Sequence, residues 1–335
     1  MQAIQLTAPT IDSLNICELP RPQPNYGEVV IRQHAVSLNY LDLALATGKF
    51  GAIAQPLIPG ADSAGEIVEL GAGVSSWQIG DRVVPGMMYR WHAGALGPDH
   101  HHALRGVTAN GGLAEYAVVP AESLVRIPDF LTWLQAATLP IAATTAWNAI
   151  VRAKIQPGST VLLLGTGGVS LFALQYAKAA GARVIILSSS NEKLARVKAL
   201  GADEGINYRE QPDWDQQVLK LTNNHGADLV LESVGASTFA KSINAAAYNG
   251  TIFVIGFIGG EELNVPVLPI MQKMLNIVGN NTGSTSDLRA AVRAIETSEI
   301  QPEIDRVFAF ADTQEAYRYL QSAGHVGKVV IDLNT

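Results

Sequence analysis

The sequence contains very little cysteine and few charged side chains. Cys17 is the only cysteine in 335 residues, so the chain cannot form an internal disulfide, and we expect a reducing, cytoplasmic location. Charged residues make up 16% of the chain and hydrophobic residues 48%, a composition typical of proteins with large cores and not of disordered chains. The formal net charge of −7 is not offset by a cluster of lysines and arginines, which argues against a nucleic-acid partner.

Long hydrophobic runs are also missing. A membrane-spanning helix needs about 20 consecutive apolar residues, and the apolar-rich residues 136–149 are interrupted by threonines, Pro140 and Asn148. Residues 1–8 do not have the charged and apolar blocks of a signal peptide. We therefore expect no membrane partner.

The hydrophobic pattern changes along the chain, and a length of 335 residues predicts two domains. Residues 1–127 show short apolar alternations separated by Gly, Pro and Asn, which is typical of an antiparallel, barrel-like β domain. Residues 128–283 alternate between strand and helix patterns, which predicts a parallel sheet covered by helices. Residues 284–335 return to the first pattern, so we expect them to complete the first domain. Strands are predicted at residues 27–32, 64–70, 160–164, 183–187, 228–232, 251–255 and 276–279, and helices at residues 171–180, 192–200, 214–222 and 239–247.

A glycine-rich turn follows the predicted strand at residues 160–164 and leads into a predicted helix. In a Gly-x-Gly-x-x-Gly turn, the first glycine allows the tight bend and the second lets the backbone approach a pyrophosphate. The third position needs a small residue, which Ser170 supplies here. The phosphates then lie at the helix N-terminus, where free N–H groups favour negative charge. We therefore expect this turn to bind a dinucleotide, and the alternative is a purely structural turn. The binding residues would be Gly165, Thr166, Gly167, Gly168 and Val169.

Hydroxyl groups, and not a carboxylate, end the second strand of this strand–helix–strand unit. An NAD-selective site usually places Asp or Glu there to hold the ribose 2′-hydroxyl, whereas this chain has Ser188, Ser189 and Ser190, with Lys193 shortly after. Hydroxyls and a cation suit a 2′-phosphate, so we expect NADP(H) in preference to NAD(H). Glu192 argues the other way, and the alternatives are a solvated Lys193 and a helix-capping Ser189.

Motifs along the whole chain resemble those of the medium-chain dehydrogenase/reductase superfamily, which includes zinc alcohol dehydrogenases and zinc-free quinone oxidoreductases. The resemblance implies an α/β protein with a GroES-like catalytic domain (residues 1–127 and 284–335) and a Rossmann cofactor domain (residues 128–283). It further implies hydride transfer in the cleft between them and a homodimer formed by edge-strand pairing near residues 276–279. In chain order, the matching stretches are residues 60–65, 71–83, 111–116, 136–147, the glycine-rich turn, 200–203 and 327–330.

The chain departs from the zinc-binding members of this superfamily at each ligand position. Where those members have zinc ligands, this chain has Asn39, Ala61 and Ile141. Asparagine is a poor zinc ligand and the other two side chains cannot bind zinc at all. The structural zinc of the family uses four cysteines, and we therefore expect no zinc of either kind. We interpret residues 87–110 as a solvated loop. The alternative is that this segment holds a metal through His92, His100, His101 and His102.

The resemblance also implies where the rest of the cofactor binds. At the nicotinamide end we expect Thr144, Gly256 and Asn280, with buried turn or core packing as the alternative for each. Tyr208 matches a position that helps to hold the 2′-phosphate in quinone reductases that use NADPH.

The catalytic residues have to act without a metal. Asn39 and Tyr40, beside the position that zinc would occupy, are the polar groups best placed to stabilise an oxyanion. Asp62 is expected to order the cleft through an internal hydrogen bond, with a role as a base as the alternative. A cleft tyrosine of related enoyl reductases is replaced by Phe50, so water is an alternative proton donor.

The resulting hypothesis is an NADPH-dependent, zinc-independent oxidoreductase that acts on a small carbonyl, quinone or α,β-unsaturated carbonyl compound. Positioning of the substrate by the protein would supply most of the catalysis. Two alternatives stay open. One is NAD(P)-dependent oxidation of alcohols, and the other is an NADPH-binding protein with little or no catalysis, since the sequence contains no certain acid–base residue.

Overall fold

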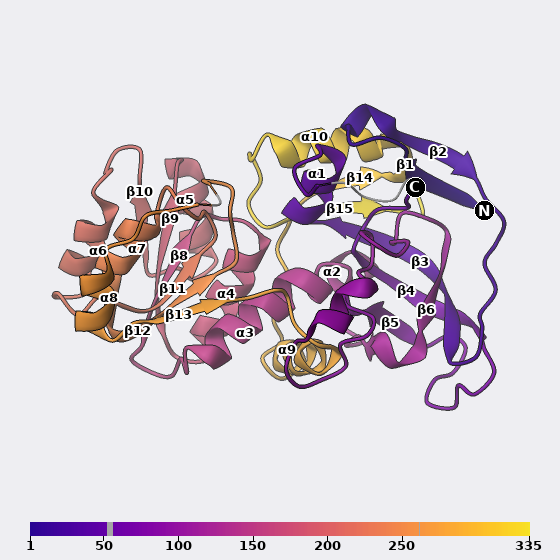
Figure 1. The fold of residues 1–335 in the computed structure, drawn as a ribbon, viewed down its shortest axis with the longest axis horizontal. Coiled ribbons are helices and arrows are strands. Elements are labelled where there is room, and N and C mark those ends of the chain that lie inside the picture. The colour runs from indigo at the N-terminus through magenta and orange to yellow at the C-terminus, as the bar shows by residue number, and fades with distance from the viewer. Residues whose placement is uncertain (52–55, 261) are drawn as a thin grey trace. The chain divides into compact units, whose positions relative to one another are not determined.

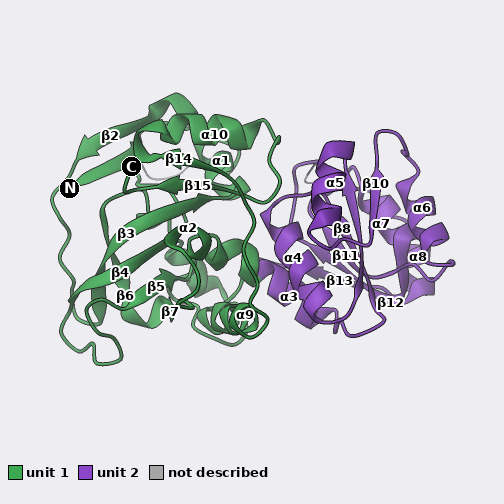
Figure 2. Cartoon of the chain, turned by 180° about the vertical axis from the view of Figure 1, so that it is seen from behind, with its two compact units in different colours: residues 1–144, 282–335 green, residues 145–281 purple. Residues whose placement is uncertain are grey.

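The chain forms two compact units in the computed structural model, which describes residues 1–51, 56–260 and 262–335 (Figures 1 and 2). Unit 1 comprises Met1–Thr144 and Thr282–Thr335, and unit 2 comprises Thr145–Asn281. The first boundary falls later than the one expected after residue 127. The reason is that helix α2 (Trp133–Ala136) and the π-helical turn η4 (Leu139–Ala143) contact strands of unit 1.

Unit 1 is built on a seven-stranded sheet in the order β14-β15-β3-β4-β5-β7, with β6 also paired to β3. Strand β3 is long enough to pair with two strands in succession, since its residues 28–32 pair with β6 and its residues 35–38 pair with β15. The separate strands β1 and β2 form a hairpin-like antiparallel pair. The strands are β1 (Gln2–Leu6), β2 (Leu14–Glu18), β3 (Glu28–Leu38), β4 (Asp62–Leu70), β5 (Arg82–Pro85), β6 (Tyr116–Pro120), β7 (Leu124–Arg126), β14 (Ile304–Ala309) and β15 (Lys328–Asp332).

The helices of unit 1 cover this sheet and close its hydrophobic cores. Helix α10 (Thr313–Gln321) packs on β15 and on α1 (Tyr40–Ala46), and α9 (Thr285–Thr297) packs on β7. One core cluster joins Leu38, Tyr317 and Val329, so it links the N-terminal part of the chain to its C-terminal part. Short helical turns complete the unit at η1 (Ile11–Ser13), η2 (Pro98–His102), η3 (Ala121–Ser123) and η5 (Phe310–Asp312).

Unit 2 is a six-stranded parallel sheet in the order β10-β9-β8-β11-β12-β13, the strand order 3-2-1-4-5-6 of a Rossmann fold (Figure 1). Its central strands are buried on both faces, which is why the sequence shows apolar runs here and not alternation. The strands are β8 (Thr160–Leu164), β9 (Arg183–Ser188), β10 (Glu204–Asn207), β11 (Ala227–Glu232), β12 (Ala246–Val254) and β13 (Asn276–Gly279).

Helices flank both faces of the sheet in unit 2. Helices α6, α7 and α8 share one core cluster with Leu162, Ile185 and Val230, whereas α4 contacts β8 and β9 and α5 contacts β9 and β10. The α/β class and the doubly wound parallel sheet predicted from the sequence are confirmed. The helices are α3 (Thr144–Arg152), α4 (Gly168–Ala179), α5 (Asn191–Ala199), α6 (Trp214–Leu221), α7 (Phe239–Ala245) and α8 (Val267–Lys273).

Helix length and hydrophobicity also bear on the membrane question. None of the helices in the described part of the chain has the length and apolar character that a membrane crossing requires.

Candidate active site

The glycine-rich turn joins β8 to α4 in unit 2 and leaves open space above itself. Gly165 has a φ of +91°, a backbone conformation that favours glycine, and its N–H donates to the carbonyl of Leu187 at 3.0 Å. Gly167 is the N-cap of the 12-residue helix α4. A Cβ added to either glycine would meet no atom within 4 Å. Ser170 is buried, as the tight helix–strand contact requires. The turn and the helix N-terminus therefore fit a pyrophosphate.

Strand β9 ends at Ser188 beside the start of helix α5, where a 2′-phosphate is expected. The Ser188 Oγ accepts from the N–H of Ser190 at 3.3 Å, and the Ser190 Oγ accepts from the N–H of Lys193 at 3.4 Å. Ser190, and not Ser189, is therefore the residue that caps α5. Ser189 is half-buried and carries no cap bond.

Tyr208 lies next to the same strand end, because its N–H donates to the carbonyl of Ser188 at 3.0 Å. The Tyr208 side chain is exposed to solvent. A carboxylate is also nearby, since Glu210 accepts from the Nδ2 atoms of Asn191 at 2.7 Å and Asn207 at 3.0 Å. Sequence reasoning missed Glu210, which is brought to α5 only by the pairing of β9 with β10.

The residues expected at the nicotinamide end have different surroundings. Thr144 is buried, and its Oγ1 has no hydrogen-bond partner among the described residues. Gly256 is required by packing, because an added Cβ would lie 1.8 Å from the carbonyl oxygen of Ser233. The N–H of Asn280 donates to the carbonyl of Val254 at 3.1 Å. Gly256 and Asn280 follow the carboxyl ends of β12 and β13, the same sheet edge as Gly165.

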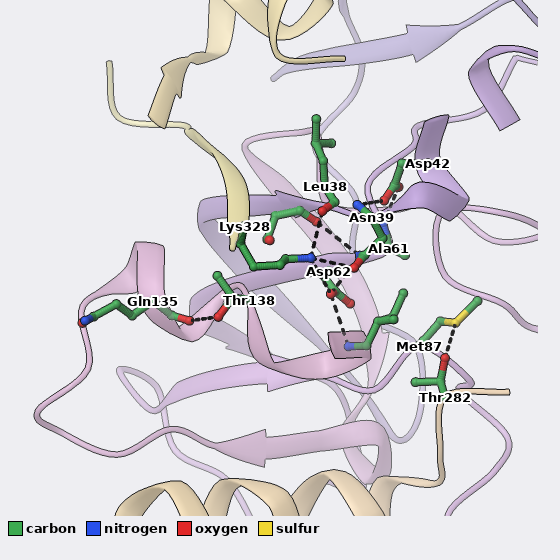
Figure 3. Close-up of polar contacts among 12 residues, drawn as sticks. Leu38, Asn39, Asp42, Ala61, Asp62, Met87, Gln135, Thr138, Thr282 and Lys328 are labelled. Atoms are coloured by element: carbon green, nitrogen blue, oxygen red, sulfur yellow. Dashed lines mark hydrogen bonds and ion pairs between the residues drawn. The ribbon is translucent and has the colours of Figure 1, made fainter. Parts of the chain in front are cut away.

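A buried polar network occupies unit 1, around the end of β3 (Figure 3). The Lys328 ammonium donates to the carbonyl of Leu38 at 2.8 Å and to Asn39 Oδ1 at 2.6 Å. The Asn39 Nδ2 in turn donates to Asp62 Oδ2 at 2.9 Å. The backbone N–H groups of Asn39 and Ala61 both donate to the carboxylate of Asp42, at 2.9 and 3.1 Å. The amide of Asn39 is thus held from both sides.

The three positions at which zinc members have ligands converge on this network. Asn39 Nδ2 and the N–H of Ile141 both donate to the same oxygen, Asp62 Oδ2, at 2.9 and 3.2 Å, and Ala61 directly precedes Asp62 in the chain. An amide and two alkyl side chains do not fit a zinc ion. Across the described residues, no group of three or more His, Cys, Asp and Glu side chains has the arrangement to hold a metal ion.

Burial is the largest cause of the pKa shifts in this network. Asp62 is 0% exposed, and burial raises its pKa to about 7, although Lys328 and the Asn39 hydrogen bond act in the opposite direction. Burial also raises the pKa of Asp42. The Lys328 Nζ lies 4.0 Å from Asp62 Oδ2, and burial lowers the pKa of this lysine.

Among the expected catalytic residues, Asn39 and Asp62 are in direct contact, and Tyr40 follows Asn39 as the first residue of α1. The Tyr40 ring packs against the hydrophobic core of unit 1. Sequence reasoning missed Lys328 and gave no role to Asp42. A lysine that opens the apolar strand β15 was the available signal, because a buried lysine needs specific partners.

The segment of residues 87–110 is anchored at both ends by a buried arginine. Arg105 is 0% exposed, and its guanidinium donates to the Tyr89 hydroxyl at 2.8 Å and to Ser63 Oγ at 2.7 Å. The segment is thereby tied to β4 beside Asp62. Tyr89, which is buried, belongs to this anchor.

The histidines of this segment contact different partners. His100 Nδ1 accepts from the N–H of Gly97 at 2.7 Å and so stabilises a local turn. His92 lies 3.3 Å from the Glu122 carboxylate, whereas His101 and His102 are exposed.

A parallel Rossmann sheet with an open glycine turn between its first strand and helix is typical of enzymes that bind a nicotinamide dinucleotide. Comparison with known proteins gives the same class. The family model of the alcohol dehydrogenase GroES-like domain matches residues 25–129, and that of zinc-binding dehydrogenases matches residues 168–297. The chain is 42% identical over 332 residues to a zinc-type alcohol dehydrogenase-like protein of Schizosaccharomyces pombe, which covers 96% of each chain.

Solved structures extend the comparison. An NAD-dependent alcohol dehydrogenase has a TM-score of 0.89 with 32% identity, over 99% of this chain and 100% of that one. The 2-octenoyl-CoA carboxylase reductase CinF, in complex with NADP and 2-octenoyl-CoA, has a TM-score of 0.88 with 27% identity, over 99% of this chain and 87% of that one. The chain belongs to the medium-chain dehydrogenase/reductase superfamily, as its motifs predict, and is an NAD(P)-dependent oxidoreductase.

Proposed function

We propose that this protein is an NADPH-dependent, zinc-independent reductase that transfers a hydride to a carbonyl, quinone or α,β-unsaturated carbonyl compound. The observation that carries the proposal is the set of residues at the three ligand positions. Asn39 and Ile141 hydrogen-bond to the Asp62 carboxylate, and Ala61 has no ligating atom. A carboxyl–ammonium network thus takes the place of metal chemistry in this chain.

The residues of unit 2 would hold the cofactor. Gly165 and Gly167 leave room for the pyrophosphate at the N-terminus of α4, together with Thr166, Gly168 and Val169 of the same turn. Bound NADPH supplies the hydride. Thr144, with its unsatisfied hydroxyl, is the candidate for the nicotinamide end, along with Gly256 and Asn280.

Selection of the 2′-phosphate rests on the end of β9. Ser188, Ser189, Lys193 and Tyr208 offer hydroxyl groups and one cation near this strand end, and no carboxylate occupies residues 188–190. Glu192 and Glu210 weaken the preference, because both place negative charge near the start of α5. The serine end is favoured over them because it occupies the position at which NAD-selective members hold a carboxylate.

The residues of unit 1 would bind and orient the substrate. Lys328 and Asp62 fix the Asn39 amide from both sides, so Asn39 contributes by holding Asp62 in place more than by meeting the substrate oxygen with a free N–H. Tyr40 is the other polar side chain at this position. Because reduction and oxidation use the same site, NAD(P)-dependent oxidation of alcohols is the second candidate function, and the 42% identical zinc-type alcohol dehydrogenase-like relative favours it.

The cofactor preference is tested by reversing the charge of one residue. We expect Lys193→Glu to raise the KM for NADPH at least 10-fold and to leave the KM for NADH within about 2-fold, because a lost cation–phosphate hydrogen bond is worth about 1.5–3 kcal/mol. Lys220→Glu, an exposed lysine on α6 of the same unit, is the matched control and should change neither value.

The assay uses a panel of aldehydes, enones and quinones with both coenzymes, and the metal content of the purified protein is measured in parallel. Stoichiometric zinc that is needed for activity would overturn the zinc-independent proposal. A preference for NADH in the unaltered protein would overturn the choice of coenzyme.

A further inference from the structure

Asp62 has one oxygen that is fully engaged and one that is not. Oδ2 accepts two hydrogen bonds, from Asn39 Nδ2 and the N–H of Ile141. Oδ1 is buried and has no hydrogen-bond partner among the residues that the structure describes. A buried polar atom without a hydrogen-bond partner is unfavourable, so a ligand group that paired with Oδ1 would be favoured at this position.

The surroundings of Asp62 hold its carboxyl group in a fixed position through two hydrogen bonds. The Asp62 side chain is itself fully buried, whereas the two residues that donate to it, Asn39 and Ile141, are half-buried. Figure 3 shows the engaged oxygen turned toward Lys328 and Asn39. The second oxygen is left for a group that approaches from elsewhere.

The charged and titratable groups around Asp62 come from three other elements. Lys328 of β15 lies 4.0 Å away and favours the carboxylate, whereas Asp42 of α1 disfavours it. Tyr317 of α10 faces Asp42 and stays protonated, because burial and the Asp42 charge raise its pKa. The sum of these effects and of burial puts the pKa of Asp62 at about 7, so both protonation states are populated at neutral pH.

We infer that the Asp62 carboxyl is the proton donor of this enzyme and hands the proton on Oδ1 to the oxygen of a neutral carbonyl substrate. The inference rests on the proposed function, which it deepens by naming the acid and the substrate class. The substrate oxygen would be the hydrogen-bond partner that Oδ1 lacks. The Asp62 proton would take the electrophilic role that zinc has in zinc-binding members of the superfamily.

The step is balanced in atoms and electrons. The carbonyl carbon accepts a hydride with its electron pair from the reduced dinucleotide, which is thereby oxidised by two electrons. The C=O π pair moves to oxygen, and this oxygen takes the proton from Oδ1. The product is a neutral alcohol, and Asp62 remains as a carboxylate facing the Lys328 ammonium until it regains a proton from solvent. Alcohol oxidation is the same step reversed, with Asp62 as the base.

The chemistry selects the substrate class. A simple aldehyde or ketone becomes an alkoxide and needs an acid, whereas a quinone becomes a phenolate-type anion whose conjugate acid has a pKa near about 10 and which needs little help. A substrate with a carboxylate next to its carbonyl would bring that charge close to Asp42 and to the Asp62 carboxylate that the step leaves behind, so a neutral carbonyl compound is favoured.

The test is Asp62→Asn, which keeps the size and the hydrogen bonds of the side chain but has no transferable proton. We expect kcat for hexanal to fall at least 100-fold, in the range of lost general-acid catalysis, and kcat for 1,4-benzoquinone to fall less than 10-fold. In the unaltered protein, kcat/KM for hexanal should decline as the pH rises above about 7, and this decline should be absent from the variant. Carbon-13 NMR should show one carboxyl that titrates near neutral pH and disappears in the variant.

Asp42→Asn is the control for a merely structural role. It removes one of the two carboxylate oxygens that accept backbone N–H groups. Because the Asp42 charge also raises the pKa of Asp62, the two activities are compared at pH 5, where Asp62 stays protonated. Both activities should fall there by the same factor. Equal losses on both substrates in Asp62→Asn, or full hexanal activity in that variant, would overturn the assignment while the reductase proposal stood. If the unaltered protein reduced none of the substrates, the proposed function would be wrong. The NMR titration would then test Asp62 independently of activity, and an ordinary pKa for this carboxyl group would overturn the inference.

Discussion

Asp62 is a carboxyl whose pKa differs between the folded and the unfolded protein. Burial raises it to about 7 from an ordinary value of 3.8, so the folded state binds a proton that the unfolded state lacks between these two pH values. The free energy of unfolding contributed by Asp62 is therefore fully present below pH 3.8 and is lost as the pH rises toward 7. One such proton is worth at most about 1.4 kcal/mol per pH unit.

We predict that Asp62→Asn flattens this dependence. Between pH 5 and pH 8 the unaltered protein should lose about 2 kcal/mol of unfolding free energy relative to the variant, as measured by urea unfolding at each pH. Asp81 and Asp203 have lowered pKa values, so they act in acid below this window. Parallel stability profiles for the two proteins would contradict the prediction.

Some of the site residues could be predicted from the sequence around them, and others could not. Asn39, Ala61 and Ile141 were identifiable because each stands at a fixed offset from a motif. The partner of Lys328 was not, because its hydrogen bond to Asn39 joins residues 289 positions apart, and no local pattern contains that pairing. Arg105 was missed for the same reason, since its partner Ser63 is 42 residues away.

At the scale of the element, the glycine-rich turn allows a substitution that should change NADPH affinity without changing the stability of the fold. Gly167 has a φ of −76° and open space at its Cβ position, so Gly167→Ala should change the unfolding free energy by less than about 0.5 kcal/mol. It should nevertheless weaken NADPH binding at least 10-fold, because the methyl group would occupy the approach of the pyrophosphate. Fluorescence titration and thermal unfolding measure the two effects.

Gly256→Ala is the opposite case and serves as the comparison. Its Cβ would collide with the Ser233 carbonyl at 1.8 Å, so this variant should lose about 3 kcal/mol or more of stability. If Gly167→Ala bound NADPH as tightly as the unaltered protein, the turn would have to be regarded as purely structural.

Most elements of unit 2 were predictable, and the differences have tertiary causes. The helix predicted at residues 239–247 ends at Ala245, because Lys273 donates to the carbonyls of Ile243, Asn244 and Ala246 and so terminates it. The strand predicted at residues 27–32 extends to Leu38, because its second half pairs with β15. Periodicity over a short window contains neither contact.

At the scale of the whole molecule, we propose that the chain forms a homodimer through β13. Among the described residues, this strand pairs only with β12, so its other edge offers backbone groups with which a second copy can pair. The adjoining surface is apolar and exposed at Val267, Leu268, Met271, Met274 and Ile277, and patches of this kind mark association surfaces.

Ile277→Lys should convert the dimer to a monomer in sedimentation at micromolar concentration, because a lysine at this edge blocks strand pairing. Ile79→Lys replaces an exposed isoleucine of unit 1 and should leave the dimer intact. A monomeric unaltered protein, or a dimeric Ile277→Lys variant, would rule out this interface.

The pairing of β15 with β3 has a consequence for synthesis on the ribosome. Lys328, the cation beside Asp62, lies on a strand that is translated after the whole of unit 2. Until that strand is made, the nascent chain contains Asp42 and Asp62 without the lysine that pairs with their network. A polypeptide that ends before β15 therefore lacks the ammonium group that lies 4.0 Å from Asp62 in the finished protein.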